Sequence, residues 1–372
     1  MNIQHHLLIS PSIGTQRSLR SLHYGASGMG EKIYLQASLH ADELPGMLVL
    51  HHLRPLLDRA EAAGKIKGEI VLVPYANPIG LSQSLLHDQM GRFEFTTGEN
   101  FNRYYTDFAP LIQAKLAEAF TQDAKHNTSV IRAAMREVLA QAKPLTELES
   151  LRHTLMSLAF DADVVLDLHC DTEAVLHLYT GTPLWAQCEP LARYLGAHAT
   201  LLATESGGQP FDEACAQTWW KLADYFRDRF PIEMACLSVT VELRGEQDVT
   251  HELAAQDAAS LYAFLCHRGV VDEPAPALPP LLHAASPLAG SDSLTAPIAG
   301  AVAFHKQVGD VVAKGDAVFD VIDPLLDRIA TVTSNTAGVL YARENRRYAT
   351  AGMCMAKVAG SVPFKTGNLL SA

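Results

Sequence analysis

Residues 32–46, KIYLQASLHADELPG, decide the fold class of this chain. The first eight of these residues have the composition of a buried strand, and that strand ends at His40. Pro45 and Gly46 then begin an amphipathic helix, since proline is favoured in the first turn of a helix. A strand that leads into a helix through a short polar loop is the repeating unit of α/β proteins.

Strand-like and helix-like segments continue to alternate along the chain. Nearly continuous apolar runs predict strands within residues 68–80, 162–171, 175–181 and 235–243. Polar, periodic segments predict helices at 213–229 and 251–268, and two or three helices over 110–160, broken near Asn127 and Pro144. Strands that are apolar on both faces need cover on both sides, so we expect a mixed central β-sheet flanked by helices.

The sequence further divides into domains. Residues 271–287, VDEPAPALPPLLHAASP, are rich in proline and alanine and form a linker between residues 1–270 and residues 288–372. The last part contains short valine-rich segments in two similar halves, which predict a small all-β barrel-sandwich domain.

Composition limits the partners and the compartment. The 372 residues are 48% hydrophobic and carry a formal net charge of −12, which argues against nucleic acid or an anionic membrane as a partner. No apolar run approaches the roughly 20 residues that span a bilayer, and the first residues lack the pattern of a secretory signal. The six cysteines form no C-x-x-C pair, as in reduced cytoplasmic proteins. We therefore expect a cytoplasmic protein.

Two histidines stand at the ends of predicted strands. His169 lies near the end of the strand within residues 162–171, and His40 ends the first strand, with Glu43 three residues later. Ligand sites in α/β sheets form at the carboxyl ends of strands. Two imidazole nitrogens and one carboxylate suit catalytic zinc, which keeps its fourth position open to water. The H-x-x-E spacing on its own is also compatible with an ordinary loop.

Four pieces of the sequence resemble the succinylglutamate desuccinylase/aspartoacylase family, a branch of the zinc carboxypeptidase clan. They are HADELPG at 40–46, NR at 102–103, DLH at 167–169 and VEL at 241–243, and they occur in the family's order. The resemblance implies a zinc carboxypeptidase-like fold and one zinc ion per chain. The metal ligands that it implies are His40, Glu43 and His169.

The resemblance also implies catalytic roles. Glu242 takes the position of the family's general base, which removes a proton from water and passes it to the leaving amine. Glu246 is the alternative candidate for that role. Arg92 is the candidate for the arginine that polarises the scissile carbonyl, although no tight motif surrounds it.

Substrate contacts are expected from three residues. Asn102 and Arg103 match the family's substrate-binding pair, and a guanidinium group binds a carboxylate through two hydrogen bonds. Arg244 shares a predicted strand face with Glu242, so it is either a further carboxylate-binding residue or a solvated charge at the strand end.

The C-terminal domain resembles biotinyl and lipoyl carrier domains in its segments 296–300 and 308–316. A carrier needs a lysine on the hairpin between the two halves, and residues 323–331 contain none. We therefore expect this domain to cover the site, restrict substrate size or support an oligomer.

The sequence thus predicts a zinc-dependent amidohydrolase, or deacylase, that cleaves the amide bond of a small N-acyl amino acid or related acylated amine with metal-activated water. Its expected partner is a small acylated substrate that bears a carboxylate, and the sequence leaves a homo-oligomer open. One alternative is a metallocarboxypeptidase that acts on a peptide terminus. Another is a non-catalytic binding protein that retains the fold.

Overall fold

The computed structural model describes residues 1–370 of the chain. A nine-stranded sheet forms its centre. The strands of this sheet are β1 (Asn2–Leu7), β2 (Ser18–Gly25), β3 (Lys32–Ala37), β4 (Glu69–Val73), β7 (Val164–Asp171), β9 (His177–Gly181), β10 (Ala199–Ala203), β11 (Leu237–Gly245) and β12 (Ser286–Pro287). Their spatial order is β1-β2-β4-β3-β7-β11-β9-β10-β12.

The sheet is mixed, as the sequence predicts. Strands β4, β3, β7 and β11 run parallel to one another, whereas β9 pairs antiparallel with β11. Strands β1 and β2 add an antiparallel ribbon at one edge. The four parallel strands therefore bring their carboxyl ends to one edge of the sheet.

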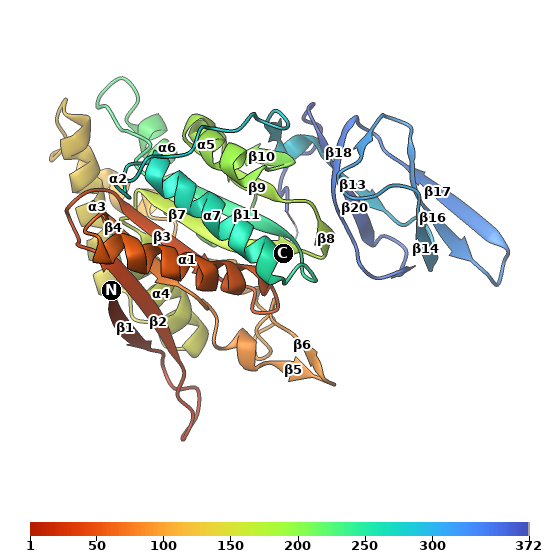
Figure 1. Cartoon of the computed structure of the whole chain (residues 1–372), viewed down its shortest axis with the longest axis horizontal. Helices are drawn as coiled ribbons and strands as arrows, with labels where there is room; N and C mark the ends of the chain where they lie inside the picture. Colours follow the sequence, from red (N-terminus) through yellow and green to blue (C-terminus); the bar gives the residue numbers. More distant parts are fainter. Residues whose placement is uncertain (371–372) are drawn as a thin grey trace.

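Helices cover both faces of this sheet (Figure 1). On one face lie α1 (Pro45–Ala62), α5 (Trp185–Leu195) and α7 (His251–His267). On the other face lie α2 (Ala109–Leu116), α3 (Ala124–Gln141), α4 (Glu147–Ala159) and α6 (Phe211–Tyr225). Neighbouring residues of β7 belong to the two separate cores, Leu166 to the first and Val165 to the second. This double burial explains why the strand is apolar throughout.

The predicted helical stretch 110–160 consists of three helices, α2 to α4. The break at Pro144 is confirmed, and a capping box formed by Thr146 and Glu149 begins α4 just after it. The break predicted near Asn127 falls slightly earlier, at residues 117–123, and Asn127 itself lies in the first turn of α3. Its buried side chain donates to the carbonyl oxygens of Thr121 and Pro231, at 2.8 and 2.9 Å, so it fastens the preceding loop instead of ending a helix.

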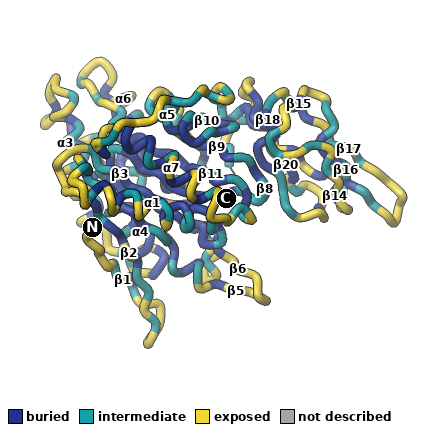
Figure 2. Tube along the Cα trace, viewed as in Figure 1, coloured by how far each residue is buried: buried dark blue, intermediate teal, exposed yellow. Residues whose placement is uncertain are grey.

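The C-terminal strands form two antiparallel sheets. They are β13 (Ser291–Thr295), β14 (Gly300–Phe304), β15 (Val311–Val312), β16 (Ala317–Asp323), β17 (Arg328–Thr333), β18 (Gly338–Arg343), β19 (Tyr348–Ala349) and β20 (Cys354–Gly360). One sheet has the order β13-β20-β18-β15 and the other β17-β16-β14-β19. An apolar core that includes Phe319, Leu340 and Met355 binds the two together. Figure 2 shows this buried centre beside an exposed β16–β17 hairpin.

Strand pairing joins the two parts of the molecule. The short strand β8 (Glu173–Ala174), directly after β7, pairs with β18 of the C-terminal part. Leu201, Leu288 and Tyr341 belong to a separate apolar cluster at this junction. The linker segment ends in β12, which pairs with β10 of the central sheet. The C-terminal domain is therefore fastened beside the end of β7, where the candidate metal ligands lie.

Two further features complete the fold. Strands β5 (Ser84–Leu85) and β6 (Asp88–Gln89) form a small exposed hairpin. Within residues 1–370, none of the helices combines the length and the apolar character that crossing a bilayer requires.

Candidate metal centre and active site

Three adjacent parallel strands position the candidate catalytic groups. In the register of the sheet, Leu168 of β7 lies opposite Ala37 of β3, and His169 lies opposite Glu242 of β11. Paired residues on neighbouring strands point to the same face of a sheet. The carboxyl edge of the sheet therefore places His169 and Glu242 next to each other and beside the loop that follows β3.

The loop after β3 carries two of the predicted ligands. Ser38 adopts a left-handed backbone conformation with φ of 57°, and its hydroxyl donates to the carbonyl oxygen of Glu43 at 2.9 Å. Gly46, at the start of α1, packs so closely that an added Cβ would lie 2.9 Å from Cβ of Leu168. The Pro-Gly sequence thus allows the helix to begin against the strands and holds His40 and Glu43 over the sheet edge.

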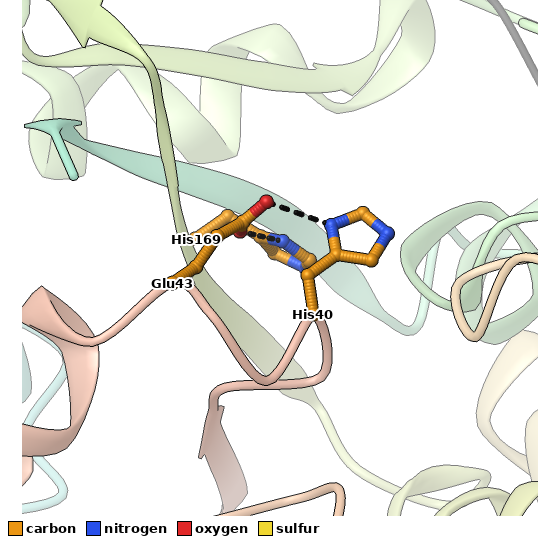
Figure 3. Close-up of side chains that lie close together, drawn as sticks. All are labelled: His40, Glu43 and His169. Atoms are coloured by element: carbon orange, nitrogen blue, oxygen red, sulfur yellow. Dashed lines mark hydrogen bonds and ion pairs between the residues drawn. The ribbon is translucent and has the colours of Figure 1, made fainter. Parts of the chain in front are cut away.

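The side chains of His40, Glu43 and His169 converge on one point (Figure 3). The two carboxylate oxygens of Glu43 lie 2.8 Å from Nδ1 of His40 and 2.7 Å from Nδ1 of His169. The backbone N–H of Cys170 donates to the second of these oxygens at 3.2 Å. One donor atom from each of the three side chains lies within 4.8 Å of the other two. All three residues are buried.

Hydrogen bonding fixes which nitrogen of His40 is available as a ligand. Nε2 of His40 lies 2.9 Å from Oδ1 of Asn100, and that oxygen also accepts the backbone N–H of Asn102 at 2.8 Å. Because an amide oxygen only accepts, Nε2 is the protonated nitrogen of the neutral ring. The lone pair of Nδ1 therefore points toward Glu43, as a metal ligand requires.

His169 has a matching partner on its far side. Oδ2 of Asp167 lies 3.0 Å from Nε2 of His169. The two groups form an ion pair, and neither atom has a hydrogen-bond partner among the described residues. The other oxygen of Asp167 accepts a hydrogen bond from Gln36 at 2.9 Å. Asp167 is therefore placed to orient the His169 ring.

The cluster fits a metal ion by donor type and charge. Burial alone would raise the pKa of the Glu43 carboxyl, but the two imidazoles outweigh burial and hold that pKa well below its usual range. The carboxylate is therefore ionised, as coordination requires. Two imidazole nitrogens and one carboxylate oxygen form the ligand set of many catalytic zinc sites.

Glu242 lies next to this cluster and is partly open to the cavity in front of it. Its Oε2 atom is buried and has no hydrogen-bond partner among the described residues. Burial, and then the negative charge of Glu43, raises the pKa of Glu242 to about 8. A bound cation would oppose that rise, so the carboxylate is poised to exchange a proton near neutral pH.

A cavity of about 480 Å³ lies in front of these groups. Sites for small molecules usually measure about 300–1,000 Å³. The wall of the cavity contains all three candidate ligands together with Glu242, Arg92, Asn102 and Arg103. The structure therefore brings together seven of the nine candidate side chains that the sequence analysis named.

The remaining candidates in the cavity wall differ in how far they are exposed to solvent. They are Arg92, Asn102 and Arg103. Nη1 of Arg92 is 3.4 Å from Nδ1 of His40 and 3.5 Å from Oε1 of Glu43, and its side chain remains 42% exposed. Asn102 and Arg103 are buried. Oδ1 of Asn102 accepts the backbone N–H of Phe211 at 2.8 Å, and Asn102 is part of the cavity wall.

Arg244 is one of two candidates that the structure does not bring to the cavity. Its guanidinium pairs with Asp257 of α7, with contacts of 2.6 and 2.7 Å. The period-2 argument fails because Arg244 has φ of 69° and the register of β11 shifts between Glu242 and Gly245. Glu246, the alternative base, is also outside the cavity wall and bonds to Asn345.

Two parts of the cavity wall contain residues that the sequence analysis did not identify. One is the loop of residues 206–210. Its Gly208 has φ of 75°, and an added Cβ there would lie 2.6 Å from Cδ of Arg103. The backbone N–H of Tyr104 also donates to the carbonyl of Gly208 at 2.8 Å. This loop therefore supports the Arg103 side chain, and its two adjacent glycines were the only signal in the sequence.

The other part comes from the C-terminal domain, which was expected to cover the site, restrict substrate size or support an oligomer, although none of its contributing residues was identified from the sequence. Its contributions to the wall are Leu288, Glu344, Arg346, Lys357 and Leu370. Nζ of Lys357 lies 2.6 Å from Oδ2 of Asp171, at the end of β7. Nothing in the local sequence indicates this contact, because it depends on how the two domains dock.

The fold and the cluster together define an α/β protein of the hydrolase class whose site can hold a metal ion. The chain belongs to the succinylglutamate desuccinylase/aspartoacylase family, because the profile of the succinylglutamate desuccinylase/aspartoacylase catalytic domain matches residues 29–268. A comparison with curated protein sequences found no match.

Solved structures agree with this assignment. A succinylglutamate desuccinylase/aspartoacylase family protein from Shewanella amazonensis SB2B is 28% identical, with a TM-score of 0.86 over 96% of this chain and 98% of the other. A protein of the same description from Shewanella frigidimarina NCIMB 400 is 25% identical, with a TM-score of 0.85 over 97% and 98%. The ectoine utilization protein EutE (DoeB) from Ruegeria pomeroyi shares the fold, at 17% identity and a TM-score of 0.62 over 96% and 95%.

Proposed function

We propose that this protein is a zinc-dependent deacylase that hydrolyses the amide bond of a small N-acyl amino acid or a related acylated amine. The observation that carries the proposal is the convergence of His40, Glu43 and His169 beside Glu242 in one cavity. Family membership supports a hydrolase of this kind.

His40 and His169 would hold the metal through their Nδ1 atoms, and Glu43 through its carboxylate. A bound zinc ion would supply Lewis acidity, which acidifies water and polarises a carbonyl oxygen. The contacts of the opposite ring nitrogens with Asn100 and Asp167 support this assignment, because they orient both lone pairs toward the same point.

Glu242 acts as the general base and acid in this mechanism. Its carboxylate removes the proton from the attacking water and then delivers that proton to the nitrogen of the leaving amine. The partly unpaired carboxylate and its raised pKa support both steps. Nη1 of Arg92 lies 3.5 Å from Oε1 of Glu43, which places the guanidinium beside the candidate metal ligands. From there its positive charge can help to stabilise the negative charge that develops on the carbonyl oxygen.

Asn102 and Arg103 hold a carboxylate of the substrate. Both side chains are buried in the wall, where a guanidinium can bind a carboxylate with little competition from water. The volume of the cavity, about 480 Å³, and the part of its wall made by the C-terminal domain support a small acylated compound over a long peptide.

The direct test is a screen of N-acetyl and N-succinyl amino acids with zinc-loaded protein, with release of the free amine followed by mass spectrometry. Amine release that stops when a chelator removes the metal supports the proposal. Release of C-terminal residues from peptides, without hydrolysis of small acyl compounds, would favour a carboxypeptidase. No hydrolysis of either kind would favour a binding protein.

A further inference from the structure

The chain after β20 runs from the C-terminal sheets back to the cavity. Residues 364–370, called the C-terminal segment below, contain neither helix nor strand, and most of them are exposed. Leu370 nevertheless lies in the wall of the cavity that holds the candidate metal ligands. Because an exposed segment of this kind buries little apolar surface, its hydrogen bonds indicate what holds it in place.

Backbone hydrogen bonds hold the C-terminal segment at both of its ends. At its start, the N–H groups of Phe364 and Lys365 both donate to the carbonyl oxygen of Ala289 at 3.0 Å. At its other end, the N–H of Leu369 donates to the carbonyl oxygen of Ser206 at 2.9 Å, and the next N–H donates to the same oxygen at 3.3 Å. The segment therefore links the C-terminal domain to the loop of residues 206–210.

Two adjacent glycines of this loop separate the C-terminal segment from Arg103. A Cβ atom added to Gly207 would lie 2.6 Å from Oδ1 of Asn368 in the segment. A Cβ atom added to Gly208 would lie 2.6 Å from Cδ of Arg103. The loop is therefore in contact with the segment through one residue and with the arginine through the next.

Ser206 makes the loop dependent on the segment. This residue is only 3% exposed, and its backbone N–H donates to Oε1 of Glu213 at 2.7 Å. Its carbonyl oxygen accepts the two N–H groups of the segment. A buried carbonyl oxygen that loses its donors is costly, so without these bonds the loop would move to bring that oxygen to water. A movement of the loop would also move the support of Arg103.

We infer that the C-terminal segment positions Arg103 for the carboxylate of the substrate, and that it acts through the loop of residues 206–210. The inference rests on the function proposed above, in which Arg103 binds that carboxylate. Asn368 and Leu369 are then positioning residues. A binding side chain that is held in one geometry loses less freedom when the substrate binds, so the segment lowers KM without acting on the scissile bond.

Two proline variants test this inference in the full-length, zinc-loaded protein. Leu369→Pro removes the N–H that donates to Ser206. We expect KM for N-acetylalanine to rise about tenfold, while kcat and the zinc content stay near the wild-type values. KM for N-acetylalanine amide, which lacks the carboxylate, should change little. Thr366→Pro is the matched control, because Thr366 is exposed and its N–H has no hydrogen-bond partner within residues 1–370.

The same variants contain the results that overturn the inference. These are an equal rise of KM for the acid and the amide, or equal effects of the two prolines. A double-mutant cycle adds a further criterion. If the segment acts through Arg103, Leu369→Pro should cause little further loss in a protein that already carries Arg103→Lys. Fully additive effects would show that the segment does not act through this arginine.

Hydrogen–deuterium exchange separates this inference from the proposed function, because it needs no substrate. We expect the backbone N–H groups of residues 101–105 and 206–210 to exchange at least about tenfold faster in Leu369→Pro than in the wild type or Thr366→Pro. Unchanged exchange overturns the inference even if the protein proves to be a deacylase. Faster exchange in a protein that hydrolyses no acyl compound supports the link from the segment to Arg103 and contradicts only the proposed function.

Discussion

Glu242 and His169 lie opposite each other on the adjacent parallel strands β11 and β7. Because both residues are paired within the sheet, their side chains are held next to each other by backbone hydrogen bonds and not by a mobile loop. A proton-transfer group fixed in this way beside a candidate metal ligand is the arrangement that hydrolysis of an amide by activated water requires.

Replacement of this glutamate separates metal binding from proton transfer. Glu242→Gln keeps the size of the side chain but cannot accept the proton, so we expect kcat to fall by about 100- to 10,000-fold while the metal content stays at the wild-type level. Steady-state kinetics and elemental mass spectrometry on the same sample measure both quantities. A kcat close to that of the wild type would show that another group is the base.

The two predicted arginines at the substrate end should behave differently. Arg103→Lys removes the forked donor geometry from the cavity wall, so we expect KM for a carboxylate-bearing substrate to rise about tenfold. Arg244→Lys serves as the matched control, because Arg244 pairs with Asp257 outside the cavity and its replacement should leave KM unchanged. A raised KM in Arg244→Lys together with an unchanged KM in Arg103→Lys would show that Arg244, and not Arg103, binds the substrate carboxylate.

The glycine that supports Arg103 offers an independent check. Gly208→Ala places a methyl group 2.6 Å from Cδ of Arg103, so the arginine or the loop has to move. We expect kcat/KM to fall at least about tenfold, since misplacement of a binding group by about 1 Å is costly to catalysis. Gly64→Ala is the control, because Gly64 has a similar φ of 67° but nothing within 4 Å of an added Cβ. Equal activity in both variants would contradict the supporting role of the loop.

A buried histidine near the domain junction predicts a pH dependence of stability. Burial lowers the pKa of His177 from 6.5 to about 4, and among residues 1–370 only one of its ring nitrogens has a hydrogen-bond partner. The unfolded chain therefore binds a proton below pH 6.5 that the folded protein does not bind. The free energy of unfolding should decrease as the pH falls from 6.5 to 4, by up to about 3 kcal/mol from this residue.

In the wild type the ring centroids of His177 and Tyr341 lie 4.9 Å apart. His177→Phe keeps a ring at this position but removes the group that titrates. Denaturant unfolding at several pH values should show a shallower acid slope for this variant than for the wild type. His126→Phe, on an exposed face of α3, should keep the wild-type slope. Identical slopes for all three proteins would show that His177 is protonated at little cost in the folded state.

The sequence predicts the centre of this protein well because the decisive signals are local. His40, Glu43 and Gly46 lie within seven residues of one another. The strand that carries His169 consists largely of apolar residues, which indicates that it is buried. The antiparallel insertion of β9 between β11 and β10 depends on contacts between distant segments, so the sequence indicated a mixed sheet without its strand order.

The errors have physical causes as well. Strict alternation placed Arg244 on the face of Glu242, but a left-handed residue and a shift of register turn it toward α7. The break predicted near Asn127 falls slightly earlier, because this asparagine bonds to the preceding loop from within the first turn of α3. The contributions of Lys357 and Glu344 to the cavity depend on domain docking, for which a single sequence carries no local pattern.

The central claim is that His40, Glu43 and His169 hold one metal ion. Elemental mass spectrometry on untagged wild-type protein, Glu43→Ala and His169→Ala, each supplied with zinc and then passed through a desalting column, tests it directly. His126→Ala serves as the control for loss of an exposed histidine. We predict about one zinc ion per chain in the wild type and the control, and little in the two site variants. A wild-type chain without bound metal, or site variants that retain a full equivalent, would contradict the account.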